Sequence, residues 1–191
     1  LCSYWGGSQG LSPTYERAHV VSDLLTLVST NGRKRVKVLL AAVNAKYIHS
    51  NLAVHSLKAY ARTYTEEIEV AEYTINQTFD AILQDIYRRK PDLLGISCYL
   101  WNIEYVGQLL RELPKILPDT KIWLGGPEVS YDAKAVLEQY PKVEGVMCGE
   151  GEETFAELLR VYHEEKGALC SGVKRDELFS DIPGIAYRNK D

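Results

Sequence analysis

Two glycine-containing segments of this 191-residue chain each follow a short apolar run, and their residue types suit ligand binding. They are Gly125-Gly126-Pro127-Glu128, after residues 122–124, and Gly149-Glu150-Gly151-Glu152, after residues 143–148. Each apolar run is typical of a buried parallel strand. Ligands of open α/β sheets bind in the crevice outside the carboxyl ends of such strands. We therefore expect the two segments to form part of a ligand-binding rim.

Aromatic and polar side chains follow two further apolar runs, at residues 36–43 and 93–98. The candidates there are Asn44, Lys46, Tyr47 and His49 in the first loop, and Ser97, Tyr99, Leu100 and Trp101 at the second. Aromatic rings beside glycine backbone suit a large, flat, partly apolar ligand with polar edges better than they suit a phosphate. The expected ligand is therefore a sizeable organic group.

The same loops exclude several common ligands of α/β sheets. Residues 44–51 contain no glycine, whereas a dinucleotide-binding domain needs glycines in its first turn so that backbone can approach the pyrophosphate. The chain has no G-x-x-x-x-G-K-[ST] phosphate loop and no G-x-S-x-G nucleophile turn. The expected ends of the first and third strands also lack the carboxylates that a response-regulator receiver needs.

The elements that would position these residues alternate along the chain. Strands are expected at residues 36–43, 68–73, 93–98, 121–124 and 143–148, with a last strand at 182–188 after a loop through 167–180. Helices are expected at residues 52–64, 79–87, 133–140 and 155–162, the first with Ser50 or Asn51 as its N-cap, and another is expected from residue 103 to an end around Pro114 and Pro118. This alternation predicts an α/β fold, a three-layer, doubly wound parallel sheet of flavodoxin-like or Rossmann-like type in the strand order 2-1-3-4-5.

Composition and charge narrow the class of protein further. The formal net charge is −4 and the Lys and Arg residues are scattered, so no nucleic-acid partner is expected. No stretch approaches the roughly 20 apolar residues of a membrane span, and no secretory signal is seen, so we expect a cytoplasmic protein that binds no membrane. One domain is expected at residues 36–191, preceded at residues 1–35 by an extension that is either foreign to the domain or an accessory helix.

The order of these segments resembles the N-terminal cobalamin (vitamin B12)-binding domain of cobalamin-dependent radical S-adenosylmethionine (SAM) enzymes. Residues 44–61 look like its first loop and helix, and residues 95–100 look like its third strand and serine turn. Its "GGP" and "GEGE" turns are matched at residues 125–127 and 149–152, and residues 182–188 resemble its exit strand. The resemblance covers about residues 36–191 and implies a Rossmann-like cobalamin-binding domain.

The resemblance also implies where cobalamin would bind. In such domains the nucleotide tail of cobalamin enters between the loops after the first and fourth strands, and the corrin ring lies over the strand ends. Ser97 would then hydrogen-bond the buried tail, and Gly125 and Gly126 would let backbone approach it. Residues 149–152 would form the far wall. The alternatives are tight turning for the glycines and helix capping for Glu152.

His49 is the candidate cobalt ligand. Methionine-synthase-like cobalamin domains use D-x-H-x-x-G, whose histidine ligates cobalt from below. Around His49 the Asp is absent, and Asn51-Leu52 stand where the glycine would be expected. This loop often lacks a cobalt ligand in the radical enzymes, so a loop or capping role is the preferred alternative for His49. His55, within the first helix, is expected to be structural.

The iron–sulfur motif of the radical family is absent. A four-iron cluster needs closely spaced thiolates, as in C-x-x-x-C-x-x-C, whereas Cys2, Cys98, Cys148 and Cys170 lie far apart. SAM and the four-iron four-sulfur cluster would therefore belong to a catalytic domain, in cis or in trans, toward which the exit strand leads. We predict a cobalamin-binding module of a radical SAM enzyme, with methyl transfer as the preferred reaction and no catalysis by this chain alone.

Two alternatives stay open at this point. The chain could be a flavodoxin-like interaction or regulatory domain that has lost its cofactor, with Tyr47, Tyr99 and Trp101 filling the crevice themselves. Flavin mononucleotide is less well supported, because the first loop lacks the run of Ser, Thr and Gly donors that a phosphate needs.

Overall fold

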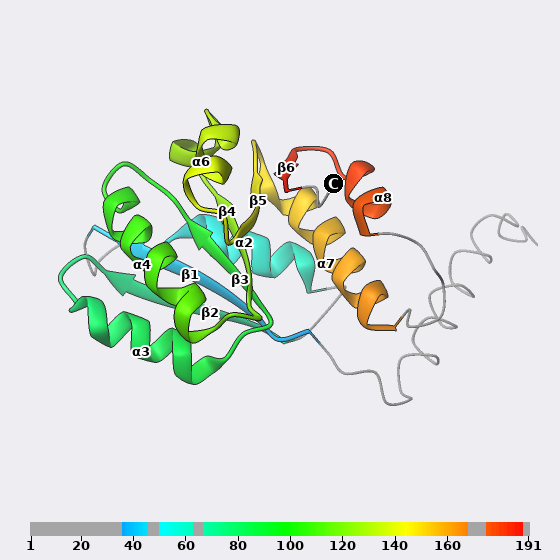
Figure 1. The fold of residues 1–191 in the computed structure, drawn as a ribbon. Helices are drawn as coiled ribbons and strands as arrows, with labels where there is room; N and C mark the ends of the chain where they lie inside the picture. The colour runs from blue at the N-terminus through cyan, green and yellow to red at the C-terminus, as the bar shows by residue number, and fades with distance from the viewer. Residues whose placement is uncertain (1–35, 46–49, 63–66, 168–174, 189–191) are drawn as a thin grey trace, which may run out of the picture. The chain divides into compact units, whose positions relative to one another are not determined.

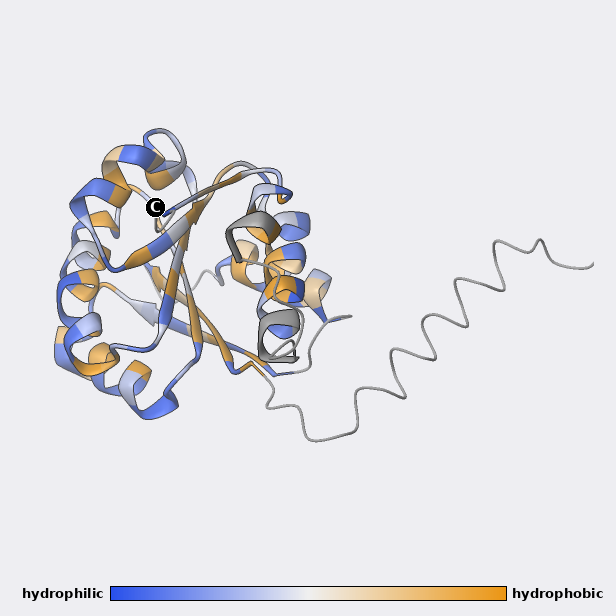
Figure 2. Ribbon diagram, turned by 45° about the vertical axis from the view of Figure 1, so that its right-hand side comes forward, coloured by the Kyte–Doolittle hydropathy of each residue, from blue (hydrophilic) through white to orange (hydrophobic). Residues whose placement is uncertain are grey.

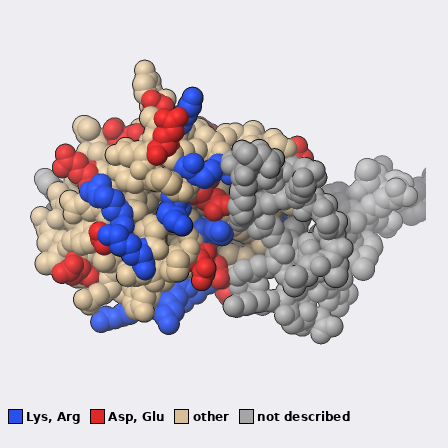
Figure 3. Space-filling view, viewed as in Figure 1, with Lys and Arg blue, Asp and Glu red and all other residues tan. Residues whose placement is uncertain are grey.

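A computed structural model describes residues 36–45, 50–62, 67–167 and 175–188. The expected extension at residues 1–35 lies outside these ranges, as do three site candidates, Lys46, Tyr47 and His49. Within the described ranges no helix is long and apolar enough to cross a membrane. On the face drawn in Figure 3, basic and acidic side chains are interspersed over the surface.

Six strands of the described residues form one sheet in the order β2-β1-β3-β4-β5-β6 (Figure 1). Neighbouring strands are parallel, except that β6 is antiparallel to β5. The strands are β1 (Val38–Asn44), β2 (Ile68–Thr74), β3 (Leu93–Ser97), β4 (Lys121–Gly125), β5 (Val143–Met147) and β6 (Ile185–Tyr187). The predicted order 2-1-3-4-5 is confirmed, and its switch point lies between β1 and β3.

Helices cover both faces of the sheet and turn their hydrophobic sides toward it (Figure 2). On one face pack α3 (Phe79–Arg89), α4 (Ile103–Ile116), α5 (Pro127–Ser130) and α6 (Ala133–Gln139). On the other face pack α2 (Leu52–Ala61), α7 (Gly151–Gly167) and α8 (Arg175–Ser180). The central strand β1 is buried along its whole length because both of its faces are covered, which explains its unbroken apolar sequence.

Proline lies near an end of two helices, one predicted and one not. α4 ends at Ile116, between Pro114 and Pro118 as expected, and Pro114 is tolerated in its last turn because it removes only one backbone hydrogen bond there. Residues 127–130, expected as a turn, form the single helical turn α5. Pro127 occupies the first position of α5, where a proline has no amide hydrogen to lose and its fixed φ suits the helix.

The segment after α7 also differs from the prediction. Residues 175–180, expected within a loop, form α8. The ring of Phe179 in α8 is buried and meets Trp123 edge-on, with 5.6 Å between ring centroids. A helix of six residues is marginal by itself, so this packing stabilises it. The last strand is present as predicted, but it is shortened to β6.

Candidate cofactor-binding site

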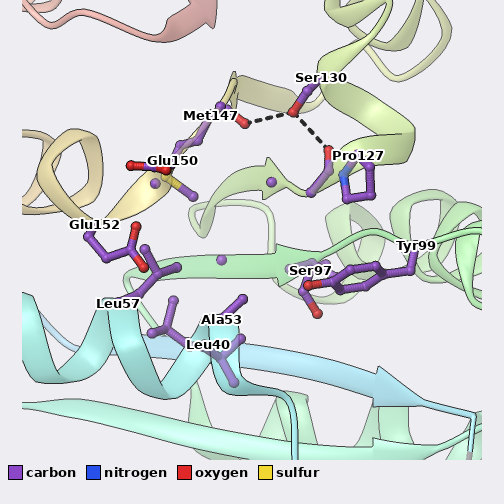
Figure 4. Close-up of a pocket in the computed structure, with 17 residues that line it drawn as sticks. Leu40, Ala53, Leu57, Ser97, Tyr99, Pro127, Ser130, Met147, Glu150 and Glu152 are labelled. Carbon is purple, nitrogen blue, oxygen red and sulfur yellow. Dashed lines mark hydrogen bonds between the residues drawn. The ribbon is translucent and has the colours of Figure 1, made fainter.

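A cavity of about 450 Å³, here called the main cavity, lies at the carboxyl edge of the sheet between α2 and α7 (Figure 4). Its volume falls within the range of about 300–1,000 Å³ that is typical of sites for small organic ligands. Many of the predicted site residues line it: Ser97, Tyr99, Gly125, Gly126, Pro127, Gly149, Glu150, Gly151 and Glu152. The structure therefore brings the ends of β3, β4 and β5 together around one space.

Ser97 is a buried polar residue of the main cavity, with 7% of its surface exposed. It ends β3, and its hydroxyl oxygen accepts a hydrogen bond from Asn51 Nδ2 at 3.2 Å. Asn51 is the N-cap of α2, because its Oδ1 accepts a hydrogen bond from the Val54 amide at 3.4 Å. The residue that caps α2 therefore also holds the hydroxyl that faces the cavity.

Glu72 on β2 anchors the start of α2 from the side. Its Oε1 accepts hydrogen bonds from the Asn51 amide at 2.6 Å and from Asn44 Nδ2 at 3.1 Å. Its Oε2 pairs with His55 Nε2 at 2.9 Å, which gives His55 a structural position. Burial alone would raise the pKa of Glu72, but the hydrogen bonds from His55, Asn51 and Asn44 outweigh it and lower the pKa. Glu72 is therefore charged at neutral pH.

The two glycines at the end of β4 have different roles. Gly126 has a φ of 110°, and a Cβ there would lie 2.3 Å from the carbonyl oxygen of Cys98, so the turn itself requires glycine. A Cβ on Gly125 would make an ordinary contact, 3.4 Å from Met147 Cε, so the missing side chain leaves room in the cavity. Gly125 thus fits the expected role of admitting a ligand, and Gly126 fits the alternative of tight turning.

The wall on the α7 side carries two carboxylates, Glu150 and Glu152 (Figure 4). Ser56 Oγ on α2 donates to Glu152 Oε1 at 2.7 Å, which links the two helices beside the cavity. This hydrogen bond, together with one from the backbone amide of Glu152, lowers the pKa of the carboxyl. Glu152 therefore lies in the cavity wall, as expected, and also accepts hydrogen bonds in the first turn of α7, as in the capping alternative.

A second cavity of about 570 Å³, here called the rim cavity, adjoins the start of α2. Three of the candidates line it, Asn44, Tyr99 and Trp101. The rings of Tyr99 and Trp101 stack with 4.5 Å between centroids and an interplanar angle of 6°, and Trp101 Nε1 donates to the Val43 carbonyl at 3.3 Å. The two rings thus pack against each other and leave the main cavity open.

Two candidates lie outside both cavities. Leu100 is 78% exposed, and Glu128 is exposed in the first turn of α5. Sequence reasoning also missed lining residues of the main cavity, most of them apolar: Leu40, Ala53, Val54, Leu57, Gly95, Ile96, Ser130 and Met147. Apolar periodicity predicts that a helix packs on the sheet, so it gives no sign of a cavity between the two.

The described residues hold no cluster of three or more His, Cys, Asp or Glu side chains that could bind a metal ion. Cys98 is a free thiol, and burial raises its pKa to about 12. Cys148 is also free and is half-buried. Cys98 therefore packs as a small buried hydrophobe. The candidate cobalt ligand His49 belongs to the part of the chain that the structure does not describe.

A family model for the B12-binding domain matches residues 38–159. The chain belongs to the B12-binding domain family. The matched residues run from β1 into α7 and include every residue that lines the main cavity. The family and the cofactor class predicted from the sequence are therefore confirmed.

Two curated relatives are methyltransferases. The cobalamin-dependent radical SAM methyltransferase TokK of Streptomyces tokunonensis is 34% identical over 99 residues, which cover 52% of this chain and 13% of that protein. The 2-(S-pantetheinyl)-carbapenam-3-carboxylate methyltransferase of Streptantibioticus cattleyicolor is 35% identical over 69 residues, which cover 36% of this chain and 10% of that protein. This chain thus spans a small part of the length of either relative.

A solved structure confirms the fold. The cobalamin-dependent SAM radical enzyme OxsB, with aqua-cobalamin and SAM bound, has a similar fold with a TM-score of 0.64 and 19% sequence identity. The match covers 82% of this chain and 21% of that chain. The predicted doubly wound α/β sheet is therefore shared with an enzyme of the family that the sequence resembles.

The residues of the main cavity fit the nucleotide tail of cobalamin. Gly125 leaves part of the cavity wall without a side chain, so a flat base can lie close to the end of β4. The buried hydroxyl of Ser97 could pair with a polar atom of such a base. No Lys or Arg is among the described residues that line the cavity, which suits an uncharged base better than a phosphate dianion.

Proposed function

We propose that this chain holds cobalamin for a radical SAM enzyme that transfers methyl groups. Membership of the B12-binding domain family supports cobalamin as the ligand, and the buried Ser97 hydroxyl in an open cavity carries the assignment of the site. When bound, the cobalt of cobalamin would carry the methyl group. The binding unit in this proposal is residues 36–191, and its cytoplasmic location stays a prediction.

The nucleotide tail occupies the main cavity in this proposal. Ser97 donates a hydrogen bond to the base, and residues 125–127 line the β4 side of the base. Residues 149–152 form the opposite wall, where the carboxylates can accept hydrogen bonds from hydroxyl groups of the tail. The chain's own residues thus bind and shield the tail without taking part in a covalent step.

The corrin ring lies over the strand ends, beside the rim cavity. Asn44 and the stacked rings of Tyr99 and Trp101 give that surface both polar and aromatic character, and Trp101 is 49% exposed. An exposed aromatic face is suited to contact with a large flat ligand. Residues 46–49 continue the same loop, and their contact with the corrin, including His49 as a cobalt ligand, stays a prediction.

The alternative of a domain that has lost its cofactor is less well supported. Such a domain would fill its crevice with its own side chains, whereas Tyr99 and Trp101 stack on each other beside an open main cavity. Flavin mononucleotide also fits poorly, because its phosphate would meet Glu150 and Glu152 and no basic side chain among the described lining residues.

A catalytic domain, in cis or in trans, is the proposed partner, and it would hold SAM and the four-iron four-sulfur cluster. Three exposed apolar or aromatic side chains near the carboxyl edge of the sheet offer it a surface: Leu52 is 80% exposed, Leu100 78% and Tyr131 97%. Large exposed apolar side chains can mark an interaction site where they lie together. Leu100 therefore fits the partner surface better than the cofactor site.

A visible-absorbance titration of the purified full chain with hydroxocobalamin tests the proposal. The chain should retain the corrin colour through desalting, and it should bind cobinamide, which lacks the nucleotide tail, at least about tenfold more weakly. Incubation of the loaded chain with SAM should give no turnover. A folded chain that retains no colour would contradict cobalamin binding and favour the domain that has lost its cofactor.

Variants of single hydroxyl side chains localise the site. Ser97→Ala should weaken cobalamin binding by about tenfold and leave cobinamide binding unchanged, because it removes one hydrogen bond to the tail. Thr78→Ala is the matched control, since this exposed threonine lies outside both cavities and its side chain makes no capping hydrogen bond. Equal effects of Ser97→Ala on cobalamin and on cobinamide would place the tail elsewhere.

A further inference from the structure

The side-chain amide of Asn51 is held in one orientation. Its Oδ1 accepts from the Val54 amide at 3.4 Å, and its Nδ2 lies 3.2 Å from Ser97 Oγ. The reverse orientation would set the NH₂ group against the Val54 N–H, donor against donor, and is disfavoured. Asn51 is buried, and Glu72 holds its backbone amide at 2.6 Å. Asn51 therefore presents a donor to Ser97.

The hydroxyl of Ser97 is left with a hydrogen to donate. Its oxygen accepts from Asn51, and the described residues provide no acceptor for its own hydrogen. A hydroxyl whose lone pair is engaged by a fixed donor points its hydrogen elsewhere, and for Ser97 the open direction is the main cavity. A ligand atom that pairs with Ser97 must therefore be an acceptor.

Most of the space beside Ser97 is apolar. Ser97 lies on one side of the main cavity and Glu152 on the other, with Ala53 and Leu57 of α2 and Leu40 of β1 between them (Figure 4). A polar edge that faces these side chains loses its hydrogen bonds to water and gains none from the protein. The cavity is therefore selective against a base with several polar edges.

Two of the other polar side chains of the cavity, Ser130 and Glu152, are already engaged. The Ser130 hydroxyl donates to the carbonyls of Gly126 at 2.8 Å and Met147 at 3.2 Å. The Glu152 carboxylate accepts from Ser56 at 2.7 Å. Tyr99 and Glu150 also line the cavity but are not buried. Among the described lining residues, Ser97 is thus the buried polar side chain whose hydrogen remains available to a ligand.

We propose that Asn51 is a positioning residue that sets Ser97 as a donor, and that the main cavity thereby selects the base of the cobamide. The favoured base has one bare ring nitrogen and otherwise apolar edges, as in the dimethylbenzimidazole of cobalamin. Adenine carries further ring nitrogens and an exocyclic amine, and cresol has no ring nitrogen. The inference rests on the proposed function, because the tail must enter the main cavity.

Binding of four corrinoids to the full chain tests the selectivity, with the corrin absorbance after equilibrium dialysis as the readout. Cobalamin should bind at least about tenfold more tightly than the adenine cobamide, whose extra polar groups would face the apolar side chains of Leu40, Ala53 and Leu57. It should also bind about tenfold more tightly than the cresol cobamide, which leaves the Ser97 donor without an acceptor. Cobinamide, which has no base, should bind most weakly.

The outcomes separate this inference from the proposed function. Equal affinities for cobalamin and the adenine cobamide, with weaker binding of cobinamide, would overturn the selectivity and leave the proposed function standing. Equal affinities for cobalamin and cobinamide, or no binding of any corrinoid, would overturn the proposed function and this inference with it.

Asn51→Asp tests the positioning role. The variant keeps a side-chain oxygen for the N-cap of α2 but replaces the Nδ2 donor with an acceptor, so Ser97 donates to residue 51 instead of to the ligand. Cobalamin affinity should fall by about tenfold while the affinity for the cresol cobamide stays the same. A merely structural role for Asn51 would weaken all the cobamides alike.

Two further variants keep the test decisive even where Asn51→Asp impairs folding. Ser97→Ala removes the donor without touching the cap, and it should abolish the preference for cobalamin over the cresol cobamide. Asn76→Asp repeats the charge change at an exposed position outside both cavities and should leave all four affinities unchanged. A Ser97→Ala protein that keeps the preference would refute the assignment of Ser97 as the donor.

Discussion

The carbonyl oxygen of Cys98 lies where a side chain on Gly126 would have to begin, because a Cβ there would be 2.3 Å from it. The Cys98 amide also donates to the carbonyl of Gly125 at 2.7 Å, so the ends of β3 and β4 are joined backbone to backbone. No side-chain rotation can relieve a contact between main-chain atoms. The β4 edge of the main cavity is therefore set by the fold and does not depend on a ligand.

Gly126→Ala should lower the free energy of unfolding by about 3–5 kcal/mol, since it adds a main-chain clash to the strain of a positive φ. Gly149→Ala is the matched control. Its φ is 83°, but nothing lies within 4 Å of its Cβ position, so only strain of about 1–2 kcal/mol is expected. Urea denaturation of the three proteins measures both losses. Equal losses would show that the Cys98 contact is relieved by backbone movement.

Gly125→Val should leave the fold intact and weaken cobalamin binding by more than about tenfold. Its Cβ would be 3.4 Å from Met147 Cε, an ordinary contact, and its methyl groups would occupy the main cavity. Lys121→Val, at the other end of β4 and outside both cavities, is the matched control and should keep the affinity. Unchanged affinity of the Gly125→Val protein in the hydroxocobalamin titration would exclude the main cavity as the tail site.

The hydrogen bond between Ser56 and Glu152 predicts a pH dependence of stability. It lowers the pKa of Glu152 from the ordinary value of 4.5, so the carboxylate stabilises the fold above the pKa of the unfolded chain. That stabilisation is lost as the pH falls through the pKa of the folded chain. Because the group is largely solvated, Glu152→Gln should cost under about 1 kcal/mol at neutral pH. In acid, the Glu152→Gln protein and the unsubstituted chain should be equally stable.

Thermal midpoints of both proteins from neutral pH down to about pH 3 measure this difference. Glu153→Gln is the control, because it removes an exposed carboxylate from the same first turn of α7 and reports the effect of the helix terminus alone. A Glu152→Gln curve that coincides with the Glu153→Gln curve would show that Ser56 contributes nothing to the pH dependence.

The strand order could be predicted from the sequence because each strand is a short apolar run between recognisable helices. α3 is an example, with Ile82 and Ile86 fully buried one helical turn apart. α8 could not be predicted in this way. Its six residues are held by the packing of Phe179 against Trp123, a contact between distant parts of the sequence that no local pattern indicates.

About half of the candidate site was visible in the sequence, because glycine turns and strand ends are marked by residue type. Val54 and Leu57 were not, since the sequence of an apolar helix face is the same whether that face meets side chains or lines a cavity. For Asn51, a polar residue, the sequence likewise indicates only part of the role. Its capping role follows from local sequence, but its hydrogen bond to Ser97 spans 46 residues and depends on the sheet.

Trp101→Ala separates a cobalamin site from a crevice filled by the chain itself. If this is a cobalamin site, the variant should bind cobalamin about tenfold more weakly, because the indole would contact the corrin. Loss of the ring stack with Tyr99 should lower the free energy of unfolding by under about 2 kcal/mol. Tyr87→Ala on α3 is the matched control, since Tyr87 is 45% exposed against 49% for Trp101 and lies outside both cavities. It should leave the affinity unchanged.

If the chain is instead a domain that has lost its cofactor, Trp101→Ala should have the opposite effects on affinity and stability. There the stack of Tyr99 and Trp101 would be core packing, so removal of the indole should cost about 3–5 kcal/mol of stability, as for large core aromatics. No corrinoid would bind before or after the change. Urea denaturation and the hydroxocobalamin titration on the same two variants therefore decide between the two functions. The 49% exposure of Trp101 in the folded chain favours the cobalamin site, because a core side chain would be buried.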